Sequence, residues 1–99
     1  MTIRVDPQGN EIGLMKTIGS WRDKKVIEIG CGDGRLTQRI AHLGPKLIQA
    51  IDPDPSLIST ARKTLPEAFA KQIRYKTGTA EDLKYPPEAF NIAVFSWVL

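Results

Sequence analysis

The residues with the clearest chemical potential are the glycines of a short turn that follows an apolar run. Residues 26–37 read VIEIGCGDGRLT, so a β-branched run ends on Gly30 and leads through Gly32 and Gly34 into a helical pattern. Glycine accepts positive φ values and lets a ligand approach the backbone without a Cβ atom in the way. The start of the following helix adds unpaired N–H groups, which favour an anionic group. This segment predicts a ligand site built largely from backbone.

Asp52 is the second candidate, because it ends the next predicted strand eighteen residues beyond Gly34. In a doubly wound sheet an acid at this point lies beside the glycine turn and can accept hydrogen bonds from both ribose hydroxyls. The alternative is that Asp52 only caps a turn with Pro53. A strand, a glycine turn, a helix and a terminal acid in register predict an adenosine-type ligand site.

A sheet is needed to position these residues, and the chain alternates short apolar runs with helical patterns. Helices are predicted over residues 34–43 and 54–65, the second with Asp54 as N-cap before Pro55. A helical lead-in, capped by Asn10, is predicted within residues 1–20. Strands are predicted at 26–30, 47–51, 73–77 and 91–99. The order indicates half of a doubly wound α/β sheet with parallel strands.

The composition agrees with one small domain over residues 1–99, with 41% hydrophobic and 25% charged residues. These values exclude a disordered tail and a collagen-like chain. A single cysteine, Cys31, excludes an intrachain disulfide, and one Cys with one His predicts no zinc site. The net charge of +3 is spread along the chain, so nucleic acid is not indicated. No apolar run is long enough to span a membrane, and a cytoplasmic protein is expected.

The glycine spacing distinguishes between cofactors. Dinucleotide enzymes carry G-x-G-x-x-G, whose last glycine would fall on Arg35. The pattern E-x-G-x-G-x-G, from Glu28 to Gly34, instead resembles motif I of class I S-adenosylmethionine-dependent methyltransferases. The resemblance extends over DPQGNE (6–11), AIDPDPSLISTAR (50–62), GTAEDL (78–83) and FNIAVFSWVL (90–99). It implies a Rossmann-like sheet with strand order 3-2-1-4 and flanking helices.

The resemblance also implies roles for individual residues around S-adenosylmethionine. Glu28 would help to hold the methionine amino group, directly or through water, although it could instead pair with Lys24 or Lys25. The remaining residues implied to contact or border the cofactor are Gly30, Cys31, Gly32, Gly34 and Ser96 at the methionine end, and Asp52, Pro53, Ala80 and Glu81 at the adenosine end. Thr79 departs from the family pattern. The family often has an acid at this position, directly after the glycine that is Gly78 here, and that acid contacts the adenine amino group.

The implied reaction is transfer of the sulfonium methyl group to a substrate that the sequence does not identify, and no catalytic base is predicted. The family's sheet is about twice this size, so the chain is expected to be a truncated, N-terminal cofactor-binding half that is inactive alone. The alternatives are a non-catalytic α/β folding or assembly module, or a dinucleotide-binding oxidoreductase fragment.

Self-association is the last expectation. Arg74 and Lys76 would protect the edge formed by residues 73–77, whereas residues 91–99 are nearly all apolar. If the strand at 91–99 has no neighbour, its unpaired backbone groups can pair with a second chain. A homodimer or aggregation through residues 91–99 is therefore predicted.

Overall fold

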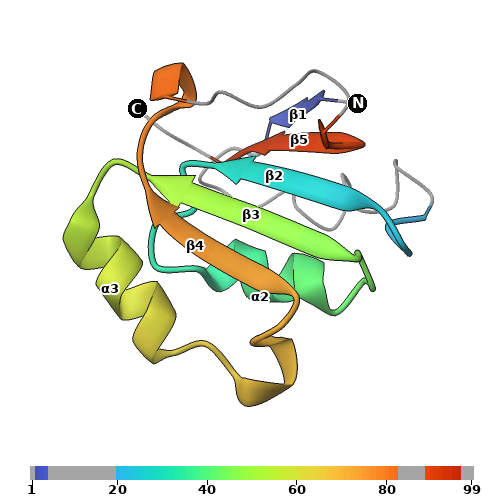
Figure 1. Ribbon diagram of the computed structural model, residues 1–99, viewed down its shortest axis with the longest axis horizontal. Helices are drawn as coiled ribbons and strands as arrows, with labels where there is room; N and C mark the ends of the chain where they lie inside the picture. The colour runs from blue at the N-terminus through green and yellow to red at the C-terminus, as the bar shows by residue number, and fades with distance from the viewer. Residues whose placement is uncertain (1, 5–19, 83–88, 97–99) are drawn as a thin grey trace.

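The computed structural model describes residues 2–4, 20–82 and 89–96, which contain one five-stranded sheet (Figure 1). The strands lie in the spatial order β1-β5-β2-β3-β4, and every neighbouring pair is parallel. Their bounds are β1 Thr2–Arg4, β2 Lys25–Ile29, β3 Leu47–Asp52, β4 Ile73–Thr77 and β5 Ile92–Phe95. The four predicted strands are all present, and their predicted order 3-2-1-4 is confirmed as β4-β3-β2-β5.

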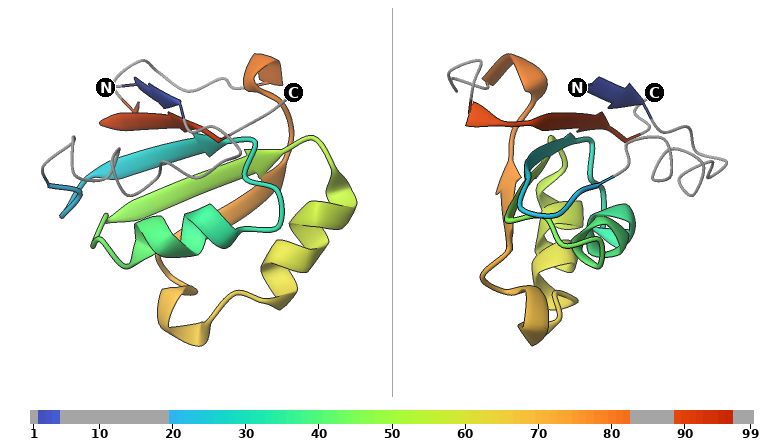
Figure 2. Two further views of the ribbon diagram at one scale, coloured as in Figure 1. Left: turned by 180° about the vertical axis from the view of Figure 1, so that it is seen from behind. Right: turned by 90° about the vertical axis from the view of Figure 1, so that its right-hand side faces the viewer.

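Two helices cover one face of the sheet. The helix α2 (Arg35–Ala41) connects β2 to β3, and α3 (Pro55–Lys63) connects β3 to β4. Figure 2 shows both on the same side, as expected when two right-handed crossovers run in the same direction across a sheet. Short 3₁₀ turns follow at η1 (Glu67–Phe69) and η2 (Ala80–Asp82).

The core lies between this helical layer and the sheet. Alternate residues of the central strands face the helices, among them Val26, Ile48 and Val94, each at most 1% exposed. Ile40 of α2 and Ile58 of α3 close the core from the other side. Leu43, after the end of α2, and Leu57 of α3 lie at the margin of this core and are 36% and 37% exposed.

The strand β1 corrects one expectation. Thr2, Ile3 and Arg4 pair in register with Ala93, Val94 and Phe95, so β5 has neighbours on both sides. The expectation that this edge lies open is therefore wrong for Ile92–Phe95, and self-association through residues 91–99 loses its structural basis. The sequence Thr2-Ile3-Arg4 gave no strand signal, because it holds a single apolar residue and pairs only through tertiary contact.

The predicted helix from Asn10 onward lies outside the described residues. So does the end of the fourth predicted strand, at residues 97–99.

Candidate functional site

The glycine turn after β2 has the backbone geometry that its composition predicts. Gly30, Gly32 and Gly34 have φ values of 83°, 57° and 91°, in the left-handed region that glycine adopts without strain. The backbone N–H groups of Gly30 and Cys31 both donate to the Ile51 carbonyl, at 2.8 and 3.0 Å. These bonds fix the turn against the end of β3.

Gly32 and Gly34 lack a side chain for different reasons. A Cβ atom on Gly32 would meet no heavy atom of the described residues within 4 Å, so these residues leave the space above Gly32 open. A Cβ atom on Gly34 would lie 2.4 Å from the Tyr75 hydroxyl oxygen and 3.3 Å from the Ala61 Cβ. Gly32 is thus accessible to a ligand, whereas Gly34 allows the start of α2 to pack against β4 and α3.

Asp52 holds three segments together at the carboxyl end of the sheet. Its Oδ2 accepts a 2.9 Å hydrogen bond from the Gly32 N–H, and its Oδ1 accepts one of 2.9 Å from the Asp54 N–H. Its backbone carbonyl accepts from the Gly78 N–H at 3.0 Å. The bond from the Asp54 N–H agrees with the alternative interpretation of Asp52 as the cap of a turn. The bond from the Gly32 N–H shows that Asp52 also lies beside the glycine turn. A carboxylate has about four acceptor positions, so two remain on Asp52.

Glu28 is a fully buried carboxyl group with two hydroxyl partners. It lies on the central strand β2 and is 0% exposed. The Thr37 hydroxyl donates to Oε1 at 2.5 Å, and the Ser96 hydroxyl donates to Oε2. Pairing with Lys24 or Lys25 is therefore wrong, because Glu28 points into the core and both lysines are exposed.

The same surroundings alter the acidity of Glu28. Burial raises the pKa of this carboxyl group, the nearby Asp52 raises it further, and the bonds from Ser96 and Thr37 act in the opposite direction. Both carboxyl oxygens face protein hydroxyls, so this residue links β2, α2 and the end of β5. Direct contact of Glu28 with a ligand stays a prediction.

Cys31 and Ser96 lie on either side of the end of β2. Cys31 is 6% exposed, and burial raises the pKa of its thiol, with Glu28 and Asp52 raising it further. A protonated, buried thiol agrees with the interpretation of Cys31 as a small loop residue and not a nucleophile. Ser96 is 9% exposed, and its N–H donates to the Ile29 carbonyl at 3.0 Å.

The residues predicted for the adenosine end follow β3 and β4. Pro53 is exposed directly after Asp52, and the exposed η2 turn carries Ala80 and Glu81. The pairing of Asp52 with Thr77 and the hydrogen bond from Gly78 place the start of this second loop beside the first. The structure thus brings both predicted loops to the same edge of the sheet.

Thr79, the position at which the sequence departs from the family pattern, has an acid beside it. The Thr79 N–H and hydroxyl both donate to Oδ2 of Asp82, each at 2.9 Å. These bonds, with a contribution from Lys76, lower the pKa of the Asp82 carboxyl. A carboxylate is therefore present at this loop, supplied from three residues further along the chain.

Sequence reasoning missed two residues of the site, Thr37 and Tyr75. Thr37 lies three and four residues before the buried Ile40 and Ala41, so helical spacing already places its hydroxyl on the buried face of α2. Tyr75 was assigned only to an edge strand, yet its hydroxyl is buried against Gly34 without a hydrogen-bond partner. Burial raises the pKa of Tyr75 to about 12. Only the tertiary fold brings Tyr75 to the glycine turn.

The described part of the chain holds neither a metal-binding cluster nor a membrane-spanning helix. Residues 2–4, 20–82 and 89–96 contain no group of three or more His, Cys, Asp or Glu side chains that could hold a metal ion. None of the helices in these ranges has the length and apolar character needed to cross a membrane.

Comparison with known proteins identifies the family. The profile of the methyltransferase domain family matches residues 26–99. The chain is 33% identical over 70 residues to a ubiquinone biosynthesis O-methyltransferase of Azorhizobium caulinodans, covering 71% of this chain and 27% of that protein. The match therefore spans about a quarter of that relative's length.

Two solved structures show the same fold. The YcgJ protein of Bacillus subtilis superposes with a TM-score of 0.74 at 26% identity, over 85% of this chain and 36% of that one. The Trypanosoma brucei PRMT1 enzyme-prozyme complex with AdoHcy gives a TM-score of 0.68 at 26% identity, over 78% and 24%. The sequence match and the shared fold lead to one conclusion: this chain belongs to the class I S-adenosylmethionine-dependent methyltransferase family and covers the N-terminal part of its fold.

Proposed function

We propose that this chain binds S-adenosylmethionine at the carboxyl ends of β2 and β3. The observation that carries the proposal is the hydrogen bond from the Gly32 N–H to Asp52, with open space above Gly32. It joins the backbone turn that would receive the methionine end to the carboxylate that would receive the ribose. A ligand with a sugar diol and a polar chain a few bonds away, as in S-adenosylmethionine, would be able to contact both groups.

The residues at each end suit the two halves of this cofactor. At the methionine end, the backbone of Gly30, Cys31 and Gly32 offers close approach without side chains. At the ribose, the two remaining acceptor positions of Asp52 match two hydroxyl donors. At the adenine, Pro53, Ala80 and Glu81 would form the border, in keeping with their exposure.

Asp82 would supply the acceptor for the adenine amino group that Thr79 does not. Its Oδ2 accepts both hydrogen bonds from Thr79. Its Oδ1 would accept the hydrogen bond from the adenine amino group. Because its pKa is lowered, Asp82 would be a carboxylate at neutral pH and able to accept.

The function of the whole protein would be methyl transfer from the bound cofactor to an acceptor. The sulfonium group supplies an activated methyl and a good leaving group when bound. The described residues contribute binding and orientation, and orientation lowers the barrier of a displacement reaction. Ser96 and Glu28 would position the methionine end, Glu28 through its bonds to Thr37 and Ser96. No described residue is proposed as a catalytic base.

Isothermal titration calorimetry against S-adenosylhomocysteine and NAD tests the binding step. We expect S-adenosylhomocysteine to bind more tightly than NAD, and Asp52→Ala to weaken its binding by about 1–3 kcal/mol, because hydrogen bonds to a charged acceptor are lost. Asp33→Ala is the matched control, since Asp33 lies in the same turn but pairs with Arg35 at 3.1 Å. Tighter binding of NAD, or an Asp52→Ala variant that folds and binds normally, would contradict the proposal.

A further inference from the structure

Five of the fourteen basic residues of this chain lie in one segment that ends on an edge strand of the sheet. Residues 62–76 contain five of them and one acid, Glu67, which gives this segment a net charge of +4. The whole chain carries +3, so the remaining residues together carry −1. The excess positive charge, which looks evenly spread along the sequence, therefore belongs to one segment. We call its basic side chains the basic strip: Arg62, Lys63, Lys71, Arg74 and Lys76.

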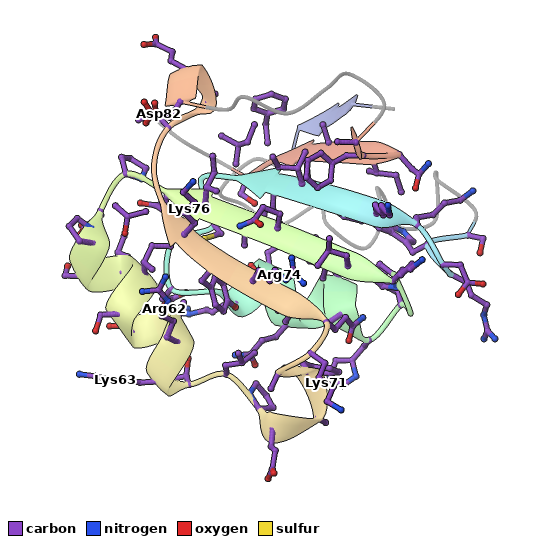
Figure 3. The ribbon with its side chains drawn as sticks, in the orientation of Figure 1. Arg62, Lys63, Lys71, Arg74, Lys76 and Asp82 are labelled. Atoms are coloured by element: carbon purple, nitrogen blue, oxygen red, sulfur yellow. The ribbon has the colours of Figure 1, made fainter. Side chains whose placement is uncertain are left out.

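The fold places the basic strip at the surface. Figure 3 shows its members over α3 and β4, the edge strand of the sheet, and all five are exposed. Arg74 and Lys76 are two residues apart on β4, so both side chains leave the same face, at a spacing of about 6.6 Å along the strand. Lys71 precedes the strand and extends the row at its amino end.

The charges of the strip are not neutralised within the described part of the chain. The salt bridge found there joins Arg35 to Asp33, and none within 4.0 Å involves a member of the strip. Lys76 interacts with Asp82 only at longer range, through a Coulombic effect on the pKa of that carboxyl. Five exposed cations thus lie along this edge without an ion pair among the described residues, which favours an anionic partner.

Arg62 has a second effect on this edge. Its Nη2 donates to the backbone carbonyl of Tyr75 at 2.8 Å, so the side chain covers part of the outer edge of β4. An acidic peptide that added as a further strand would need that carbonyl. The guanidinium keeps four other N–H donors, which suit phosphate oxygens. The edge is therefore blocked against strand addition but open to phosphates.

We propose that the basic strip binds the phosphate backbone of a nucleic acid. An anionic membrane surface is the less favoured partner, because surface binding combines cations with inserted apolar side chains. The large hydrophobic residues exposed in the described ranges are Leu43 and Leu57, and neither belongs to the strip. The strip contains no aromatic side chain for base stacking, so binding would follow the backbone and be independent of sequence.

Fluorescence anisotropy with a labelled single-stranded RNA of about 16 nucleotides tests this proposal on the whole protein, without cofactor. We expect Arg74→Glu/Lys76→Glu to weaken binding about tenfold and to reduce the slope of log K against log salt by about 1.4, for two lost phosphate contacts. The matched control is Arg22→Glu/Lys24→Glu, which makes the same change in net charge at two exposed residues before β2. It should change binding by less than about threefold.

Each alternative result overturns the proposal. An equal loss in both double variants would show that net charge matters and the position of the strip does not. Absence of RNA binding, or binding only to vesicles that contain anionic lipid, would assign the strip to no partner or to a membrane. Circular dichroism and S-adenosylhomocysteine titration of the same variants separate these results from misfolding and from failure of the proposed cofactor site.

Discussion

Two acidic regions lie on the neighbouring strands β2 and β3 and use their carboxyl groups in different ways. At Glu28 the carboxyl group is fully buried, accepts hydrogen bonds from two side-chain hydroxyls, and has a raised pKa. In the Asp52–Asp54 loop, the pKa of Asp54 is lowered first by a hydrogen bond from the Ser56 hydroxyl and then by backbone N–H groups, and Asp52 accepts backbone N–H bonds only. Glu28 lies within the parallel strand β2, one residue before its end, and Asp52 is the last residue of β3.

The difference shows what each acid can do for a ligand. Backbone N–H donors stabilise a carboxylate and leave acceptor positions free, so the Asp52–Asp54 loop can offer a charged group to the outside. Burial disfavours the charged form, so Glu28 acts mainly within the protein, by fixing α2 and the end of β5 to β2. One region supplies binding and the other supplies rigidity.

The largest expected effect comes from removing the buried acid. We expect Glu28→Ala to lower the free energy of unfolding by about 4 kcal/mol, because it leaves two buried hydroxyls unpaired and opens a cavity. Urea unfolding followed by circular dichroism measures this. Glu28→Gln is the control, since the amide retains one acceptor and gains a donor, and it should lose much less. A loss below about 1 kcal/mol in Glu28→Ala would remove the structural role assigned to Glu28.

The next largest loss of stability is expected from a substitution in the glycine turn. We expect Gly34→Ala to destabilise the fold by about 3 kcal/mol, because its φ of 91° is strained for alanine and the new Cβ would clash with Tyr75. Gly32→Ala should cost only about 1 kcal/mol of stability, since its Cβ would meet nothing within 4 Å, yet it should impair S-adenosylhomocysteine binding. Thermal unfolding and calorimetry together separate these two roles.

Tyr75→Phe tests the source of the Gly34 clash. It removes a buried hydroxyl that makes no hydrogen bond to the described residues, although the nearby Thr37 hydroxyl affects its pKa, so alone it should change stability by less than about 1 kcal/mol. Combined with Gly34→Ala it should recover part of the lost stability. If the double variant is as unstable as Gly34→Ala alone, backbone strain and not the contact with Tyr75 dominates.

The smallest effect is a difference in pH dependence. The folded-state pKa of Glu28 is raised, so its stabilising contribution is present below the ordinary value of 4.5 and is lost as pH rises through the folded-state pKa. The stability of the wild type relative to Glu28→Gln should therefore fall as pH rises above about 4.5.

Asp54 should show the opposite sign. Its pKa is lowered by hydrogen bonds from Ser56 and Leu57, so its contribution is present above the ordinary value of 3.8 and is lost as pH falls through the folded-state pKa. The stability of the wild type relative to Asp54→Ser should fall slightly in acid. Urea midpoints of both pairs between pH 3 and pH 8, a range about the two ordinary values, provide the measurement. Slopes of the same sign would contradict the comparison.

Local sequence determined the parts of this protein that depend on near neighbours. The glycine turn, the Asp54 cap with Pro55, the alternation of Ile73–Thr77 and the position of Asp52 were all predicted, because backbone conformation and strand periodicity are set within a few residues. The family pattern added the strand order 3-2-1-4.

Only the tertiary structure decided the contacts between distant segments. The sequence does not reveal that β1 pairs with the edge of β5, because three residues are too few to show the periodicity of a strand. Nor does it pair Glu28 with Ser96, 68 residues away, or bring Tyr75 to Gly34. The basic strip depends on both levels: its five charges fall within residues 62–76 of the sequence, and the packing of α3 against β4 places them along one edge of the sheet. Packing decides which distant groups share one environment, and that environment decides their charge and their partners.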